Sequence, residues 1–350
     1  MNTQKRIRRE IHHAVVRVLL HGVGVMPRRM AQELFALVGH IGHATLDRDR
    51  RRVQRHLALA FPELDERARR RLARRVFVEL GRNATDVFRG LCRPPGECAR
   101  LIATVEGERN LERACAGGRG AVVVTGHLGA WELLVAPFVQ RGLRVCVIAR
   151  PLRDPRYQRL IEDLRRRLGV EVVREGETPR ALVRALRGGA LVGVLIDQNR
   201  TSRGVWVELF GRPAWTPTGA AVLARLAGVP LVPMAIRRAG RRHRITIGEP
   251  IRVAPDEPGA ILAVTAASVK VLEGWIRETP DQWVWMYDRW RGPRVVGART
   301  VRGAARSPGR RPAETPVGTP RVTPGTASPV VPPTAVDVRP AGAVVPEVDD

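Results

Sequence analysis

A histidine and a glutamate stand five positions apart in the segment 127–132, directly after the apolar run 121–125. An imidazole that is oriented by a carboxylate can accept the proton of a hydroxyl group, and the oxygen then becomes a nucleophile. Gly129, between the two, leaves the backbone free to turn sharply and to approach a substrate. The segment therefore predicts a general-base pair in which Glu132 reaches back to orient His127.

Polar residues also follow two other apolar runs. Arg150 follows the run 145–149, and Asp197 and Gln198 follow the run 190–196. Because ligands of an open parallel sheet bind outside the carboxyl ends of its strands, we expect these groups at one edge, beside the histidine. A guanidinium there can hold a phosphate or stabilise an oxyanion. The alternatives are that Arg150 is a surface arginine and that Asp197 caps a loop or helix.

Other catalytic schemes lack their residues. The chain has no GxSxG elbow, no GxxxxGK[ST] loop, and no GxGxxG after an apolar run, so serine hydrolases and phosphate-loop enzymes are not indicated. No second histidine lies at metal-ligand spacing from His127. The four cysteines contain no CxxC pair and suggest neither a zinc knuckle nor a disulfide framework. The sequence therefore predicts no metal and no cofactor.

The residues above need a scaffold, and the pattern of the chain predicts one. Apolar runs alternate with amphipathic segments that open at a proline, at positions 155, 179 and 217. Strands without a polar face, separated by helices, are typical of a parallel sheet that is covered on both sides. We therefore expect an α/β fold with a mostly parallel sheet flanked by helices.

The flanks of this core differ from it in composition. Residues 1–45 contain two short amphipathic stretches, the second with Met30, Leu37 and Ile41 at helical spacing, which predict helices that lie in a membrane interface. The alternative is a helix pair packed on the core domain, residues 46–296. Residues 297–350 are rich in Pro, Gly, Thr and Val without a period, which predicts a disordered tail.

The chain carries 60 Lys and Arg residues against 34 Asp and Glu residues, a formal net charge of +26. Such an excess indicates anionic partners: lipid headgroups, phosphorylated substrates, nucleic acid or an acidic carrier protein. The alternative is that the arginines reflect a GC-rich genome, which favours arginine codons, and merely solvate helix faces. Because no RNP-like motif, zinc finger or helix-turn-helix signature is present, we do not expect a nucleic-acid partner.

A family resemblance rests on these same residues. The segment HLGAWELL (127–134) resembles the HxGNWE-type signature of the bacterial lipid A lauroyl/myristoyl acyltransferases, within the lysophospholipid acyltransferase-like superfamily. Four more segments match the family in order: 55–83, 149–169, 195–228 and 280–291. Ala130 and Asn199 depart from the family, which often has Asn and Asp there, so the identity of the acceptor stays open.

The resemblance implies an acyltransferase domain that moves a fatty acyl chain from a thioester to a hydroxyl of a membrane glycolipid. The donor is an acyl-carrier protein or CoA thioester, a co-substrate rather than a cofactor. The implied acceptor is a lipid A precursor at the cytoplasmic face of the inner membrane. By this likeness His127 is the base and Glu132 its partner, and the substrate-binding residues are Gly129, Trp131, Arg150, Asp197 and Gln198.

Two alternatives to this function stay open. The first is an acyl-CoA-dependent transferase that acts on a phosphatidylinositol mannoside or another polar lipid. The second is a basic anionic-lipid-binding protein with a degenerate acyltransferase fold. The aromatic cluster in 283–290 is likewise open between a membrane-interface role and packing against the last helix. Trp131, Phe210 and Trp215 are candidates for the lining of an acyl groove, with core packing as the alternative.

Overall fold

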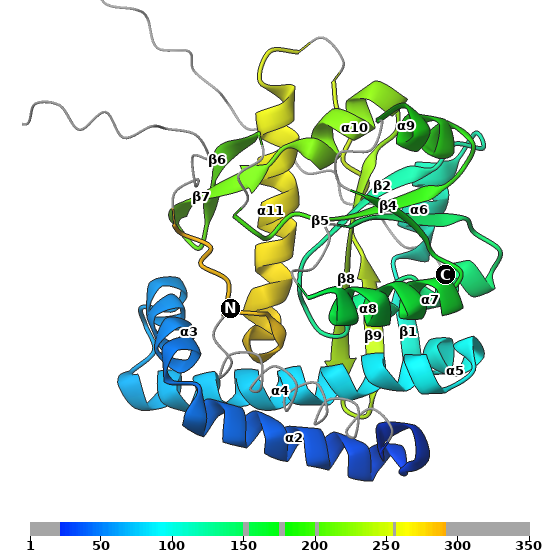
Figure 1. Cartoon of the computed structure of the whole chain (residues 1–350). Helices are drawn as coiled ribbons and strands as arrows, with labels where there is room; N and C mark the ends of the chain where they lie inside the picture. The colour runs from blue at the N-terminus through cyan, green and yellow to red at the C-terminus, as the bar shows by residue number, and fades with distance from the viewer. Residues whose placement is uncertain (1–21, 150–153, 175–178, 200–202, 255–256, 292–350) are drawn as a thin grey trace, which may run out of the picture. The chain divides into compact units, whose positions relative to one another are not determined.

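A computed structural model describes residues 22–149, 154–174, 179–199, 203–254 and 257–291 (Figure 1). The chain divides into two units, Met1–Ala298 and Arg299–Asp350, and all described residues belong to the first. Arg150, the predicted tail 297–350 and most of the first amphipathic stretch lie outside the described residues.

The core is a seven-stranded sheet in the order β1-β9-β8-β2-β5-β3-β4. The five strands from β8 to β4 are parallel to one another, β9 is antiparallel to β8, and β1 is parallel to β9. This confirms the predicted α/β fold with a mostly parallel sheet. The sheet strands are β1 Ile102–Glu106, β2 Ala121–Thr125, β3 Val145–Ala149, β4 Glu171–Arg174, β5 Leu191–Leu195, β8 Leu231–Ala239 and β9 Arg242–Ile247; β6 Gly204–Leu209 and β7 Arg212–Pro217 form a separate hairpin.

Helices cover both faces of the sheet (Figure 1). The side chains of β2 alternate between the two buried clusters on these faces. Val122 and Val124 belong to one buried cluster, whereas Ala121 and Val123 belong to the other. Strands buried on both sides need no polar face, which is why they read as continuous apolar runs. The first cluster includes α9 Pro179–Arg187, α10 Gly219–Ala227 and α11 Ala260–Glu278; the second includes α6 Glu108–Cys115, α7 Ala136–Gln140 and α8 Pro155–Arg167.

Helices α2 to α5 precede the sheet in the described part of the chain, and α4, the longest of them, supports α2. They are α2 Arg28–Thr45, α3 Asp47–Ala60, α4 Glu66–Cys92 and α5 Pro95–Arg100. Helix α2 runs alongside α4 at very short range: a Cβ at Gly39 would lie 2.4 Å from the Phe77 carbonyl oxygen, and one at Gly81 2.2 Å from that of Phe35. Because only glycine permits this approach at both positions, this part of the N-terminal segment packs on the domain.

A buried carboxylate joins α2 and α4 to the sheet. Asp86 is 0% exposed and accepts hydrogen bonds from Nε and Nη2 of Arg28, at 2.7 and 2.8 Å. Arg238 and His243, from β8 and β9, donate to the same carboxylate at 2.9 Å each. Burial acts to raise the pKa of Asp86, but the hydrogen bonds and charges of His243, Arg28 and Arg238 hold it far below its usual value. The carboxylate is thus ionised and fully partnered.

We predict that Asp86→Asn lowers the free energy of unfolding by about 3–5 kcal/mol, because it removes the buried anion that Arg28, Arg238 and His243 share. The depressed pKa sets the pH dependence: this contribution is fully present above about pH 4 and declines as the pH falls further, since protons then bind the unfolded state first. Urea unfolding of the wild type and the variant between pH 3 and pH 7 measures both effects.

The matched control is Asp163→Asn, which removes an exposed carboxylate from a surface pair with Arg166. Exposed pairs of this kind contribute about 0–1 kcal/mol. Equal losses for Asp86→Asn and Asp163→Asn would contradict the assignment of Asp86 as the anchor of α2.

Candidate active site

The ends of β2 and β5 bring a histidine and an aspartate together. The two strands pair in parallel with Thr125 opposite Leu195, and His127 and Asp197 each lie two residues beyond that pair. The Nδ1 atom of His127 lies 2.7 Å from Oδ1 of Asp197, and the backbone N–H of His127 donates to Oδ2 at 2.7 Å. One carboxylate therefore holds both the ring and the main chain of His127.

Asp197 is 2% exposed and receives a third hydrogen bond, from Nε1 of Trp283 at 2.8 Å. Burial acts to raise the pKa of this carboxyl group, but the charge and hydrogen bonds of His127 and the Trp283 hydrogen bond outweigh it and lower the pKa. Space for the carboxylate depends on Gly126, where a Cβ would lie 2.9 Å from Oδ2. Asp197 is thus an ionised, fully buried acceptor.

The hydrogen bonds around His127 determine which ring nitrogen can act as the base. An ionised carboxylate only accepts hydrogen bonds, so in the neutral ring Nδ1 carries the proton and Nε2 presents its lone pair. The side-chain nitrogen of Gln198 lies 3.1 Å from Nε2 and donates to it. The side chain of His127 is 10% exposed. Nε2 is therefore the basic atom of the ring. In this structure its lone pair accepts a hydrogen bond from the Gln198 amide, and a substrate hydroxyl group can take the place of that amide.

The segment 282–290, here called the C-terminal strap, fixes the loop that carries His127. The Gly129 N–H donates to the Gln282 carbonyl at 3.0 Å, and the Val284 N–H donates to the His127 carbonyl at 3.1 Å. Gly129 has a φ of 60°, and a Cβ there would lie 2.2 Å from the Ile236 carbonyl oxygen, so the turn requires glycine.

The aromatic residues of the strap were open between packing in the core and a membrane-interface role, and they differ in exposure. Trp283 and Trp285 are 2% and 0% exposed and pack in the core, as the packing alternative predicts. Tyr287 is 36% exposed, and its ring centroid lies 4.9 Å from that of His127. Trp131 lies against the imidazole at 5.0 Å. His127 is thus flanked by two aromatic rings that no spacing rule in the sequence would bring together.

The structure corrects the predicted partner of His127. Glu132, in the short 3₁₀ turn Trp131–Leu133, binds Arg165 of α8 through both oxygens, at 2.9 and 2.7 Å. The prediction that Glu132 accepts the Nδ1 proton is wrong, because Asp197 occupies that position. Proximity in sequence suggested Glu132, whereas the register of two parallel strands selects a residue 70 positions away. A role of Glu132 in catalysis stays a separate prediction.

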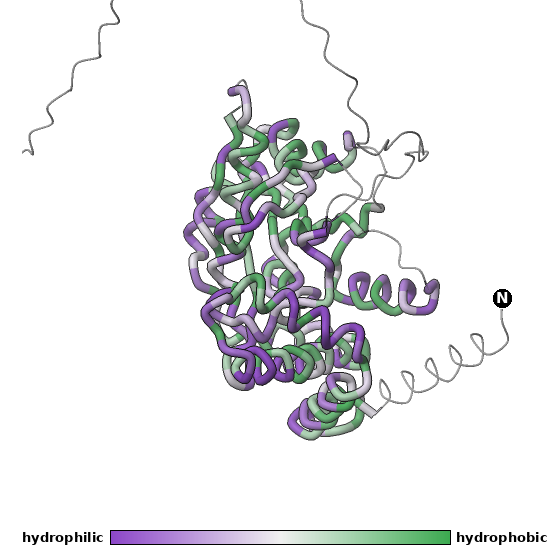
Figure 2. Tube along the Cα trace, turned by 90° about the vertical axis from the view of Figure 1, so that its left-hand side faces the viewer, coloured by the Kyte–Doolittle hydropathy of each residue, from purple (hydrophilic) through white to green (hydrophobic). Residues whose placement is uncertain are grey.

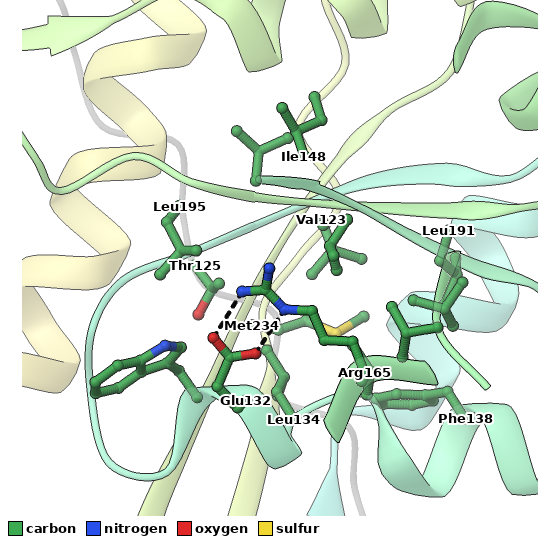
Figure 3. A pocket seen from close by; sticks show the side chains of 17 residues that line it. Val123, Thr125, Glu132, Leu134, Phe138, Ile148, Arg165, Leu191, Leu195 and Met234 are labelled. Carbon is green, nitrogen blue, oxygen red and sulfur yellow. Dashed lines mark hydrogen bonds and ion pairs between the residues drawn. The ribbon is translucent and has the colours of Figure 1, made fainter. Parts of the chain in front are cut away.

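An apolar pocket lies beside this ion pair (Figure 3). Trp131 lines it and also contacts His127, so the pocket and the imidazole share one side chain. Glu132 and Arg165 are the charged residues of its wall. Phe210 lies elsewhere, packed on Phe61 with ring centroids 5.4 Å apart. The apolar lining comes from β2, β3, β5, β8, α7 and the turns beside them: Val123, Leu134, Val135, Phe138, Val145, Val147, Ile148, Val170, Leu191, Val194, Leu195 and Met234.

Comparisons with known proteins identify the family of this chain. The family model described as bacterial lipid A biosynthesis acyltransferase matches residues 2–292. This chain belongs to that family. A phosphatidylinositol mannoside acyltransferase of Mycobacterium tuberculosis (strain CDC 1551 / Oshkosh) is 32% identical over 60% of this chain and 67% of its own length. The lipid A biosynthesis lauroyltransferase of Escherichia coli (strain K12) is 26% identical over 77% and 90%.

A third relative, the lipid A biosynthesis palmitoleoyltransferase of the same Escherichia coli strain, is 25% identical over 85% of this chain and 98% of its own length. The family and its relatives make this chain an acyltransferase. The family match also spans the described part of the fold, from α2 to the C-terminal strap. His127 and Asp197, which the fold brings together, both lie inside it.

We predict that Asp197→Asn lowers the rate of acyl transfer about 10²–10⁴-fold, because an amide can hold His127 in the wrong tautomer and cannot balance the imidazolium that forms. Glu132→Gln leaves the His127–Asp197 hydrogen bond in place and should cost much less. Steady-state rates of the purified variants, with thermal unfolding to verify the fold, measure the difference.

The charge-reversed pair Glu132→Arg with Arg165→Glu serves as the control. An ion pair that only supports the pocket wall is restored by the reversal, so the double variant should be more active than either single one. Glu132→Gln as inactive as Asp197→Asn, with no rescue by reversal, would show that Glu132 takes part in the chemistry.

Proposed function

We propose that this chain is an O-acyltransferase that moves a fatty acyl chain from a thioester donor to a hydroxyl group of a membrane glycolipid. The observation that carries the proposal is the buried His127–Asp197 pair, 2.7 Å apart, beside an apolar pocket. A base alone suits many reactions, whereas a base next to an apolar pocket suits the transfer of a chain that must leave water. Family membership supports the same reaction class.

The proposed reaction needs no group beyond the two substrates and the site. Nε2 of His127 accepts the proton of the acceptor hydroxyl, and the oxygen attacks the thioester carbonyl carbon. The tetrahedral intermediate then breaks its carbon–sulfur bond. The leaving thiolate takes the proton from the imidazolium and departs as a thiol, so the histidine ends as it began. Asp197 balances the imidazolium while it exists.

The pocket supports an acyl chain as the transferred group. Ligand sites for apolar molecules are mostly lined by hydrophobic side chains, with few polar groups that fix orientation. Here the charged groups of the wall are the paired Glu132 and Arg165, Thr125 adds a hydroxyl group, and Trp131 connects the wall to His127. We propose that the fatty acyl chain of the donor lies in this pocket, with its carbonyl carbon near Nε2 of His127.

A lipid A precursor is the proposed acceptor, because the family model over residues 2–292 describes lipid A biosynthesis. A phosphatidylinositol mannoside is the second candidate, favoured by the relative that is 32% identical. The donor is an acyl-carrier protein or CoA thioester. Mass spectrometry of the lipids of a deletion strain separates the acceptors, since one lipid class loses one acyl chain.

We predict that His127→Ala abolishes acyl transfer, with a loss of about 10²–10⁴-fold or more, because no other base lies at this position. The assay uses an acyl thioester with each candidate glycolipid, and the released thiol is measured together with the acylated product. Asp163→Asn, an exposed residue of α8, is the control and should keep the wild-type rate. Near wild-type turnover by folded His127→Ala would contradict the proposal.

The outer side of α2 supports attachment to a membrane surface. No described helix is both long and apolar enough to cross a bilayer. Large apolar side chains on α2 are nevertheless exposed: Met30 61%, Leu37 54% and Ile41 53%. Figure 2 shows hydrophobic and hydrophilic residues alternating along the N-terminal helices. Exposed apolar residues beside arginines suit an anionic interface, and we propose that α2 lies on the cytoplasmic face of the inner membrane.

We predict that Leu37→Glu with Ile41→Glu weakens binding to vesicles that contain anionic lipid by tenfold or more, because each buried leucine or isoleucine contributes about 1.5–3 kcal/mol. Co-sedimentation measures the binding. Leu226→Glu with Leu262→Glu removes equally exposed side chains from α10 and α11 and should not change it. Equal loss in both double variants would rule out α2 as the specific contact.

A further inference from the structure

A glycine lies in the interior of β5, one of the central strands of the sheet. Gly193 is opposite Val123 of β2 on one side and Val147 of β3 on the other. Glycine weakens a strand interior, because it has no side chain to pack and loses more backbone entropy on folding than any other residue. A glycine in such a place often marks a point that a ligand or another backbone must approach closely.

The main chain itself does not require glycine at this position. The φ of Gly193 is not positive, so the backbone conformation suits any residue. Among the described residues, a Cβ there would meet only Cγ1 of Val147 at 3.3 Å and the Cys146 carbonyl oxygen at 3.8 Å. At Gly120 and Gly129, by contrast, a Cβ would lie 1.7 and 2.2 Å from a carbonyl oxygen. A side chain at position 193 therefore needs only a small movement of Val147.

The apolar pocket explains the glycine instead. Gly193 lines this pocket together with Val123 and Val147, its neighbours on the flanking strands. Gly193 is partly exposed although strands pair with β5 on both sides, whereas Val123 is 5% exposed. The side of the pocket that the sheet forms, here called the floor, thus lacks a side chain at its middle strand.

The lining residues follow the strands away from His127. Thr125 and Leu195 are paired at the ends of β2 and β5, and His127 comes two residues after Thr125. Figure 3 shows Thr125 and Leu195 at one end of the pocket and Leu191 at the other. Leu195 and Leu191 are about 13 Å apart along the strand, and Gly193 lies halfway between them on the same face.

We propose that Gly193 is a specificity-determining residue that sets the length of the transferred acyl chain. The open floor lets the chain pass the middle of the pocket and reach the end at Leu191. A side chain at position 193 would stop it about 7 Å from the end at Leu195. The inference rests on the proposed acyl transfer and deepens it, because it assigns thioesters of long, unbranched acyl chains as the donors.

The expected effect follows from the burial of the chain. Each methylene group that a blocked pocket leaves in water lowers kcat/KM about fourfold. A side chain at position 193 should therefore cost more as the acyl chain becomes longer. A general defect of the sheet or of the base would instead lower the rate for all chain lengths alike.

The test is the chain-length profile of the wild type, Gly193→Ala and Gly193→Val. Saturated acyl-CoA thioesters of eight to eighteen carbons are assayed with each candidate glycolipid. The preferred chain should become shorter in Gly193→Ala and shorter still in Gly193→Val. In Gly193→Val, the kcat/KM of the chain that the wild type prefers should fall tenfold or more relative to that of a chain four carbons shorter. An unmoved profile, or an equal loss at every length, would overturn the proposal.

Two further variants separate the pocket from the fold. Gly274→Val adds the same atoms on the exposed side of α11, where a Cβ has no described neighbour within 4 Å, and should keep the wild-type profile. Gly193→Ala with Val147→Ala returns space to the pocket and should accept longer chains than Gly193→Ala alone. No recovery would contradict the place of Gly193 in the floor.

Thermal unfolding of each variant verifies the fold. Valine is favoured in strands, so Gly193→Val should be as stable as the wild type or more stable. If Gly193→Val nevertheless unfolds, the Gly193→Ala profile and its recovery in the double variant still decide.

A binding measurement distinguishes failure of this inference from failure of the proposed function. Isothermal titration calorimetry of the full chain with saturated fatty acids of the same lengths needs no acceptor, no carrier and no turnover. The chain length that binds most tightly should be shorter in Gly193→Val than in the wild type. Identical binding profiles, or binding by the wild type that does not depend on length, overturn the role of Gly193. Absence of acyl transfer by the wild type, with the expected binding profiles, overturns the proposed function alone.

Discussion

The carboxylate of Asp197 is the constraint on which the active site depends. It is buried, and its two oxygens receive the ring N–H of His127, the main-chain N–H of the same residue and the indole N–H of Trp283. These donors come from the end of β2 and from the C-terminal strap, while the acceptor follows β5. Because a buried anion must keep its partners, three distant segments are held in one geometry, and the orientation of the base follows from that geometry.

A second buried carboxylate has a different purpose. Asp86 binds two arginines and a histidine and joins α2 to the sheet, so the helix with the exposed apolar side chains is rigidly attached to the catalytic domain. The same physical device, an ionised acid surrounded by donors, thus serves attachment at Asp86 and chemistry at Asp197. The difference lies in the histidine of each site. His127 binds Asp197 through Nδ1 only and is partly exposed, so Nε2 can reach a substrate. His243, which binds Asp86, is 0% exposed.

Much of this could be predicted from the sequence, and the failures have physical reasons. The apolar runs predicted the parallel sheet, and the polar residues behind them predicted the edge where His127 and Asp197 meet. The partner of His127 was assigned to Glu132 because a residue five positions away is visible in sequence, while strand register is not. Equal offsets of His127 and Asp197 from adjacent strands were a usable signal.

The Glu132–Arg165 pair and the role of Trp283 depend on packing between distant segments, which no local pattern reveals. Arg150 lies outside the described residues, so its place in the site stays a prediction.

The central claim is that Asp197 holds His127 with Nδ1 protonated and Nε2 unprotonated. Nitrogen NMR of ¹⁵N-histidine-labelled protein, with the His127 signals assigned by their loss in His127→Ala, measures the tautomer of the ring directly. At a pH where the ring is neutral, we expect the proton on Nδ1 in the wild type and in Glu132→Gln, and a changed tautomer in Asp197→Asn. A proton on Nε2 in the wild type, or a tautomer that changes with Glu132 and not with Asp197, would contradict the account.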